Sequence, residues 1–252
     1  MRSIDINSDL GESFGAWTMG NDGQVLQQVS SANIACGFHA SDPVTMQKAV
    51  VLAKANGVAI GAHPGYPDLV GFGRREMKVS PQDLRAMVIY QVGALQAVCR
   101  AEGTKVVHVK PHGAMYNMAA KDEKLALAIA DAVASVDDSL ILVGLSGSLM
   151  ADAAAAKGLR FAAEVFADRA YEDDGSLVSR TKPGAMIEDE ELAIRRMIAL
   201  VKEGTIESIH GKKIALQADT ICVHGDSPNA IAFAKALRIA LQAEGLAIAP
   251  LA

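Results

Sequence analysis

The chain alternates short apolar runs with longer segments in which apolar residues recur at helical spacing. Seven of the runs are interpreted as strands: residues 3–7, 32–36, 58–62, 106–110, 140–144, 161–166 and 219–224. Three helical segments begin at a capping residue followed by proline: Asp42-Pro43, Ser80-Pro81 and Ser227-Pro228. Each of them ends before a glycine, as helices commonly do, at Gly57, Gly103 and Gly245.

Strand–helix alternation along a whole chain predicts parallel strands joined by right-handed crossovers. Two α/β architectures fit: an open, doubly wound sheet and a barrel of seven or eight strands. The sequence has no G-x-G-x-x-G after the first strand and no P-loop, so a dinucleotide fold lacks its best signature. Residues 208–216 interrupt the alternation and predict a small β-hairpin, turning at Gly211-Lys212, before the last strand. Without a linker or repeat, we expect residues 1–252 to form a single domain.

Composition narrows the class of protein. The 252 residues are 50% hydrophobic and carry a net charge of −5, which allows a large core and gives no electrostatic reason to expect nucleic acid binding. There is no signal core, and no run of about 18 uncharged apolar residues predicts a membrane segment. The three cysteines are odd in number and lack C-x-x-C spacing, which does not support a disulfide framework or a structural zinc site. We expect a cytoplasmic protein.

Ionisable and polar residues gather where the predicted strands end. They are Asn7, Asp9, Glu12, His39, His63, Lys110, His112, Glu164, Asp168, Arg169, His224 and Asp226. The carboxyl ends of parallel strands lie on one face of the fold, where barrels hold their active sites. A single histidine at a strand end is more often a turn or core residue. Such residues follow six strands, and a purely structural role would have to be invoked separately at each of them. The group as a whole therefore indicates an active site.

Two histidines stand apart from this group. His108 alternates with valines on a predicted strand, so it faces either the barrel interior or the helix layer. His210 lies in the predicted hairpin and is expected at the surface.

Two long connections, residues 64–80 and 167–186, show no clear helical pattern. Connections of this length are usually functional lids or disordered segments. They contain Arg74, Arg75, Arg169 and Arg180, and arginine suits the recognition of carboxylate or phosphate groups. For Arg74 and Arg75, a solvated loop charge is an equally good interpretation.

The chemistry remains open between two routes. Histidines with aspartate and glutamate can bind a divalent metal that activates water. Without a metal, the same set can perform acid–base catalysis, with Lys110 and His112 stabilising an oxyanion. Both routes indicate hydrolysis at a carbonyl, because there is no G-x-S-x-G motif and no cysteine in a recognisable nucleophile context. No H-x-x-x-H or H-x-H pair identifies metal ligands.

Longer motifs in the same places resemble the LamB/YcsF family. They are N-S-D-L-G-E-S-F-G (7–15), N-I-A-C-G-F-H-A-S-D-P (33–43), G-A-H-P-G-Y-P-D (61–68), G-F-G-R-R (71–75), V-K-P-H-G-A-M-Y-N (109–117), E-V-F-A-D-R-A-Y (164–171) and C-V-H-G-D (222–226). They occur in order over nearly the whole chain. The resemblance implies a seven-stranded, TIM-like (β/α) barrel of the glycoside hydrolase/deacetylase type.

The resemblance also implies an activity: opening of the lactam ring of 5-oxoproline to L-glutamate, coupled to ATP hydrolysis, by the A component of a three-component 5-oxoprolinase. It implies two partner proteins, the B and C subunits. Because this chain has no nucleotide-binding signature, we expect the partners to perform or complete the phosphorylation with ATP. A stand-alone metal-dependent amidohydrolase or deacetylase is the alternative, and a non-enzymatic barrel that binds a small acid is a third interpretation.

Within that activity, the strand-end residues take expected roles. Asp9 or His39 would position or deprotonate water, and Lys110 and His112 would face the oxyanion or phosphate. Proton carriers would come from Glu164, Asp168 and His224, and the remaining residues would bind substrate: Asn7, Glu12, His63, Asp226 and, for the substrate carboxylate, Arg169 or Arg180.

Overall fold

The computed structural model describes residues 3–223 and 230–251. Seven parallel strands close into a barrel, because the last of them, β9, pairs with both β6 and β1. These strands are β1 (Ser3–Leu10), β2 (Ser31–Ala35), β3 (Ala59–His63), β4 (Val106–Val109), β5 (Ile141–Leu145), β6 (Arg160–Phe166) and β9 (Thr220–Cys222). The predicted barrel is therefore confirmed, and the open doubly wound sheet is wrong for this chain.

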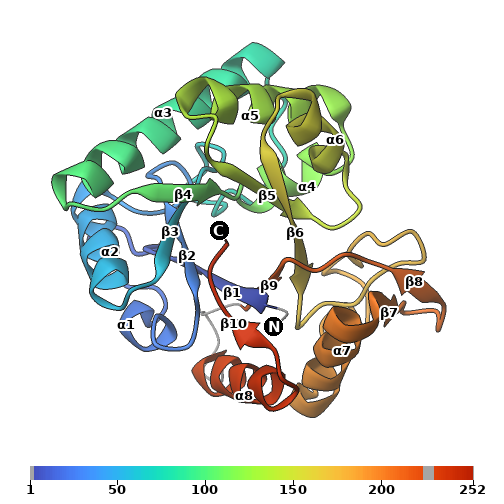
Figure 1. Ribbon diagram of the computed structural model, residues 1–252. Helices are drawn as coiled ribbons and strands as arrows, with labels where there is room; N and C mark the ends of the chain where they lie inside the picture. Colours follow the sequence, from blue (N-terminus) through green and yellow to red (C-terminus); the bar gives the residue numbers. More distant parts are fainter. Residues whose placement is uncertain (1–2, 224–229, 252) are drawn as a thin grey trace.

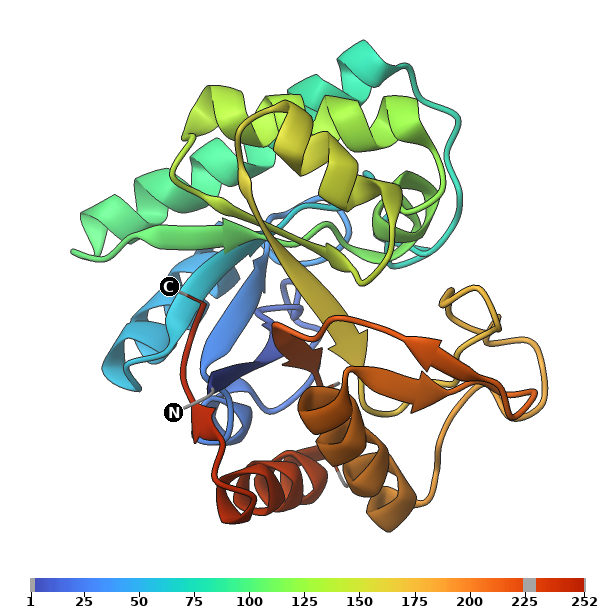
Figure 2. The ribbon, with the colours of Figure 1, turned by 45° about the vertical axis from the view of Figure 1, so that its right-hand side comes forward.

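Helices form the outer layer of the barrel (Figures 1 and 2). They are α1 (Asp22–Val25), α2 (Pro43–Ala55), α3 (Pro81–Ala101), α4 (Gly113–Ala119), α5 (Glu123–Val136), α6 (Leu149–Ala156), α7 (Glu190–Glu203) and α8 (Ala230–Ala243). Two predicted starts are confirmed: the Asp42 side chain accepts hydrogen bonds from the first turn of α2, and the Ser80 hydroxyl accepts one from Asp83 N in α3. The predicted start at Ser227-Pro228 lies outside the described residues.

Strand β1 shows how the barrel divides polar from apolar side chains. Ile4, Ile6 and Leu10 belong to the main hydrophobic core. The alternate residues Asp5, Asn7 and Asp9 instead meet polar side chains from other barrel strands. Since side chains alternate between the two faces of a strand, the odd-numbered residues of β1 point into the barrel, whose interior is polar at this strand. The strand also runs three residues past its predicted end at Asn7, which places Asp9 on the strand itself.

The small hairpin is present, with one correction to its limits. Its strands are β7 (Thr205–Glu207) and β8 (Lys213–Ala215), and residues 208–212 form the turn. The first arm lies three residues earlier than predicted, because buried Ile206 pairs with buried Ile214. His210 is exposed at this turn, as expected. A two-residue strand that the sequence did not predict, β10 (Ala247–Ile248), pairs with the start of β1.

The two long connections contain no helix, as predicted. Residues 64–80 turn around Asp68, whose carboxylate accepts a hydrogen bond from Gly71 N and pairs with Arg75. This contact favours a structural role for Arg75 over substrate recognition. Within the ranges 3–223 and 230–251, no helix is long and apolar enough to cross a membrane.

His108 faces the barrel interior, which resolves the two interpretations left by its sequence. Its Nε2 lies 2.7 Å from Asn33 Oδ1 on β2, which is separated from β4 by β3. The ring fills the space over Gly61, where an added Cβ would lie 2.0 Å from His108 Nε2. A glycine is therefore required at this position of β3.

We expect Gly61→Ala to lower the free energy of unfolding by about 1–3 kcal/mol, since a methyl group there would displace His108. Gly93→Ala is the matched control. Gly93 lies in α3 with no atom within 4 Å of an added Cβ, so alanine should stabilise the protein by about 0.5–1 kcal/mol. Urea unfolding of both variants measures the difference, and equal stability of Gly61→Ala and the parent would contradict this packing.

Candidate active site

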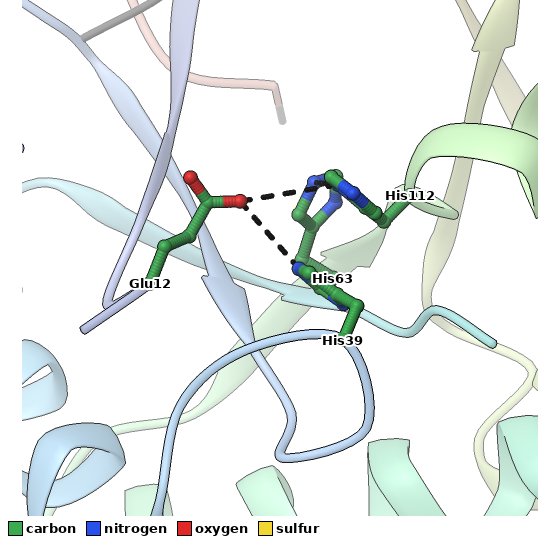
Figure 3. A group of neighbouring side chains, drawn as sticks. All are labelled: Glu12, His39, His63 and His112. Atoms are coloured by element: carbon green, nitrogen blue, oxygen red, sulfur yellow. Dashed lines mark hydrogen bonds and ion pairs between the residues drawn. The ribbon is translucent and has the colours of Figure 1, made fainter. Parts of the chain in front are cut away.

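Four predicted side chains converge beyond the carboxyl ends of the first four strands (Figure 3). Glu12 follows β1, His39 follows β2, His63 ends β3, and His112 precedes α4 as its N-cap. One nitrogen or oxygen atom from each lies within 4.8 Å of all the others. The rings of His39 and His112 stack in parallel, with centroids 3.7 Å apart. We call these four residues the histidine group.

Backbone carbonyls fix the orientation of two of the imidazoles. His63 Nδ1 lies 2.7 Å from the Lys110 carbonyl oxygen, and His112 Nε2 lies 2.8 Å from the Phe72 carbonyl oxygen. A carbonyl oxygen can only accept, so these two nitrogens carry the ring hydrogens. The other nitrogens, His63 Nε2 and His112 Nδ1, lie 3.0 Å apart, and each would carry a hydrogen only in a charged ring.

Burial keeps two of the histidines uncharged. It lowers the pKa of His112 to about 3, with the neighbouring His63 adding to the effect. Burial, together with His112 and His63, also lowers the pKa of His39 well below its ordinary value. Neutral imidazole is the form that coordinates metal ions, so His39 and His112 have the protonation state of metal ligands.

Lys110 is the central cation of a second cluster, deeper in the barrel. Its Nζ lies 2.8 Å from Glu164 Oε1, 3.0 Å from Asp9 Oδ1 and 3.2 Å from Asn7 Oδ1. Burial opposes the charge on Lys110, but the nearby Asp9, Cys222 and Glu164 outweigh it and raise the lysine pKa well above its ordinary value. Lys110 is therefore a fixed positive charge and not a proton acceptor.

Both oxygens of the fully buried Glu164 carboxylate are engaged. Oε1 accepts hydrogen bonds from Lys110 and from Asn7 Nδ2, and Oε2 accepts one from the Tyr116 hydroxyl at 2.7 Å. Tyr116 was not among the predicted site residues, nor was Asn33, whose amide donates to both Asn7 and Asp9. Both residues lie within the motifs that resemble the LamB/YcsF family, and those motifs were the sequence signal that could have identified them.

Asp9 joins the two clusters. One carboxylate oxygen accepts hydrogen bonds from Lys110 and Asn33, and the other lies 3.2 Å from His63 Nε2. Burial disfavours the ionised form of Asp9, but His63 and Lys110 outweigh it and hold the carboxyl pKa well below its ordinary value. Asp9 is thus an ionised carboxylate beside the histidine group.

A cavity of about 520 Å³ opens above both clusters. Seven of the predicted site residues line it: Asp9, Glu12, His63, Lys110, His112, Arg169 and Arg180. Arg74, Phe166 and Tyr116 line it as well. This arrangement can hold a small anionic molecule, with arginines for an acid group and a lysine, carboxylate and imidazoles beside a reacting carbonyl.

The remaining predicted residues lie elsewhere. His39, Asn7 and Glu164 are buried behind the residues that line the cavity. Among the described residues that line the cavity, Asp168 is not found, and its backbone oxygen accepts a hydrogen bond from Ile187 N. His224 and Asp226 lie outside the described residues.

Comparison with known proteins identifies the family. Residues 4–252 match the LamB/YcsF family. The chain belongs to the LamB/YcsF family. Its relatives include the 5-oxoprolinase A component of Clostridium beijerinckii, 58% identical over 100% of this chain and 98% of the relative. The corresponding protein of Bordetella pertussis is 56% identical over 98% of each chain.

Solved structures agree with this assignment. A lactam utilization protein from Thermus thermophilus is 48% identical and superimposes with a TM-score of 0.94, over 99% of this chain and 100% of that one. The catalytic domain of a peptidoglycan N-acetylglucosamine deacetylase from Eubacterium rectale superimposes with a TM-score of 0.52 at 11% identity, over 100% of this chain and 89% of that one. The LamB/YcsF chain therefore shares its barrel fold with deacetylases.

Replacing Lys110 tests the deeper cluster. We expect Lys110→Met to lower the free energy of unfolding by about 3–5 kcal/mol, because it leaves buried carboxylates without their cation. Adding Glu164→Gln should recover part of that loss, since one of the two carboxylates is then neutral. Urea unfolding of the single and double variants gives the coupling free energy between Lys110 and Glu164.

The matched control is Lys157→Met, which removes a surface ion pair with Asp131 and should change stability by at most about 1 kcal/mol. A Lys110→Met protein as stable as this control would show that Lys110 does not neutralise buried charge.

Proposed function

We propose that this chain is the A component of an ATP-dependent 5-oxoprolinase and opens the lactam ring of 5-oxoproline to give L-glutamate. The observation that carries the proposal is the full-length match, at 56–58% identity, to proteins named as that component of 5-oxoprolinase. The cavity supports it, because arginines for a carboxylate line it together with a lysine, an aspartate and imidazoles.

The lactam explains the requirement for ATP. Resonance makes an amide carbonyl a weak electrophile, and phosphorylation of its oxygen makes the carbon open to attack by water. Water then adds to that carbon, the ring C–N bond breaks, and the nitrogen takes a proton to become the amine of γ-glutamyl phosphate. A second water releases phosphate and leaves glutamate.

In our proposal, the cavity residues have separate roles in this reaction. The Asp9 carboxylate orients or deprotonates the attacking water, and the fixed charge of Lys110 stabilises the oxyanion or phosphate. We do not assign His112 the oxyanion role expected from the sequence, because its N–H donates to the Phe72 carbonyl oxygen. Arg169 or Arg180 holds the substrate carboxylate. Because both oxygens of Glu164 are engaged, we assign it to holding Lys110 in place, instead of the proton transfer expected from the sequence.

The proposal includes partner subunits. The relatives are named as one subunit of a larger enzyme, and the sequence has no nucleotide-binding motif of its own. We propose that the B and C subunits use ATP to phosphorylate 5-oxoproline and that the barrel completes the hydrolysis.

A second function is favoured by one observation, the three histidines and Glu12 at the cavity. Such a set suits a metal-dependent amidohydrolase that works without ATP or partners. The 5-oxoprolinase requires ATP and partner subunits, whereas the amidohydrolase requires neither, so one assay distinguishes the two functions.

The decisive assay measures glutamate released from 5-oxoproline, with and without ATP and with and without the two partner subunits. We expect release only when all components are present. Glutamate formed by the chain alone without ATP, or hydrolysis of other amides only, would favour the stand-alone amidohydrolase.

In the complete assembly, we expect Asp9→Asn to lower kcat by about 100-fold or more, which is the scale of a lost general acid–base group. Asp131→Asn is the control, because Asp131 is a surface carboxylate paired with Arg85 and Lys157; its kcat should not change. Unchanged kcat in Asp9→Asn would exclude this carboxylate from the reaction.

A further inference from the structure

We propose that Glu12, His39, His63 and His112 bind a divalent transition-metal ion. The site lies in the same cavity as the proposed lactam chemistry, but ion binding is measured without turnover, so either proposal can fail alone. The proposal rests on ring orientation, on a buried histidine and on the spacing of the four side chains (Figure 3).

The first reason is that two imidazole nitrogens face each other. Carbonyl oxygens hold the ring hydrogens of His63 and His112 on their far sides. The facing nitrogens are 3.0 Å apart, so the contact needs either a further proton or a metal ion between them. A metal ion bound by both nitrogens would meet that need.

The second reason comes from His39. Its side chain is fully buried, and among the described residues neither ring nitrogen has a hydrogen-bond partner. A buried polar group without a partner costs about 1–3 kcal/mol. His39 Nε2 points toward Glu12 Oε1 at 3.5 Å, a separation too long for a strong hydrogen bond and suited to two ligands of one ion.

The third reason is spacing. Zinc–nitrogen and zinc–oxygen bonds of about 2.1 Å place tetrahedral ligands about 3.4 Å from one another. The contacts of the histidine group are 3.0 Å between His63 and His112, 3.5 Å between His39 and Glu12, and 3.9 Å between His112 and Glu12. These three distances bracket the ideal edge of the tetrahedron, and all six lie within 4.8 Å.

The surroundings also match those of metal-binding histidines. Ligating imidazoles commonly donate their other N–H to a carbonyl or carboxylate, which fixes the ring. The carbonyl oxygens of Lys110 and Phe72 do this for His63 and His112. Because the four ligands follow four different strands, no short-range motif in the sequence could have identified them.

The ligand types select the class of ion. Three imidazole nitrogens and one carboxylate oxygen suit Zn²⁺ and its first-row neighbours, whereas Mg²⁺ and Ca²⁺ prefer oxygen ligands. Glu12, His63 and His112 line the cavity, so the ion would be reachable from it. When bound there, such an ion would polarise a carbonyl oxygen of a molecule in the cavity.

The test measures binding directly. The purified full chain is stripped with a chelator and titrated with Zn²⁺ by calorimetry and with Co²⁺ by visible absorption, which reports nitrogen-rich tetrahedral coordination. We expect one ion per chain and a Co²⁺ spectrum that Zn²⁺ abolishes. Mg²⁺ should not compete.

Variants show where the ion binds. We expect His39→Gln and Glu12→Gln each to weaken Zn²⁺ binding by at least about tenfold. Removing a residue that only hydrogen-bonds to a metal ligand already costs about that much, so removing a ligand should cost at least the same. His210→Ala is the matched control, because that histidine is 64% exposed on the hairpin turn; its Zn²⁺ affinity should equal that of the parent. Circular dichroism checks folding, and Glu12→Gln decides the matter if His39→Gln does not fold.

Two results would overturn the proposal. One is a stripped protein that gives no Co²⁺ spectrum and no Zn²⁺ binding, which would leave a proton shared by His63 and His112. The other is unchanged Zn²⁺ affinity in folded His39→Gln or Glu12→Gln, which would place any bound ion elsewhere. Zn²⁺ binding without glutamate release in the full assembly would reject the lactam proposal and leave the metal site standing.

Discussion

The rest of the site depends on one buried cation, Lys110, held between two carboxylates. A charge inside a protein is tolerated only with close partners, because desolvation costs several kcal/mol per ion. Asp9 and Glu164 supply those partners from strands on different sides of Lys110. Each carboxylate also accepts hydrogen bonds from other side chains. Asn33 donates to the same Asp9 oxygen as Lys110, and Tyr116 donates to the second oxygen of Glu164.

This network replaces part of the apolar layers that usually fill a barrel. Ala162, on the same face of β6 as Glu164, instead packs with Ile141 and Val143 in a small apolar cluster. The polar chain continues below Lys110, where Asn7 donates to Thr220 and Thr220 donates to Asp5. Such contacts join strands far apart in the sequence, so the barrel is closed by polar side chains as well as by backbone pairing. A fully connected network fixes each member in one position, which suits a site whose charges must face a fixed point in the cavity.

The sequence predicted the elements better than the contacts. Alternation of strands and helices left both an open sheet and a barrel, and the resemblance to the LamB/YcsF family decided for the barrel. The ionisable residues at the strand ends were enough to expect His39, His63 and His112 on one face. Ring orientation was beyond the sequence, because it depends on backbone carbonyls such as that of Phe72, in a connection without a periodic pattern. The roles of Asn33 and Tyr116 were equally hidden, since their partners lie 24 and 48 residues away in sequence.

Phe72 couples the connection 64–80 to the histidine group. It is a non-glycine residue with a left-handed backbone, φ 54°, a conformation that costs free energy unless its surroundings hold it. In that conformation its carbonyl oxygen receives the His112 N–H, and its ring packs edge-on against His39 and His112. The shape of the connection and the hydrogen position on His112 are therefore thermodynamically linked. A ligand that binds the histidine group only in this conformation would stabilise the connection, and a partner that stabilises the connection would raise the affinity at the histidines by the same factor.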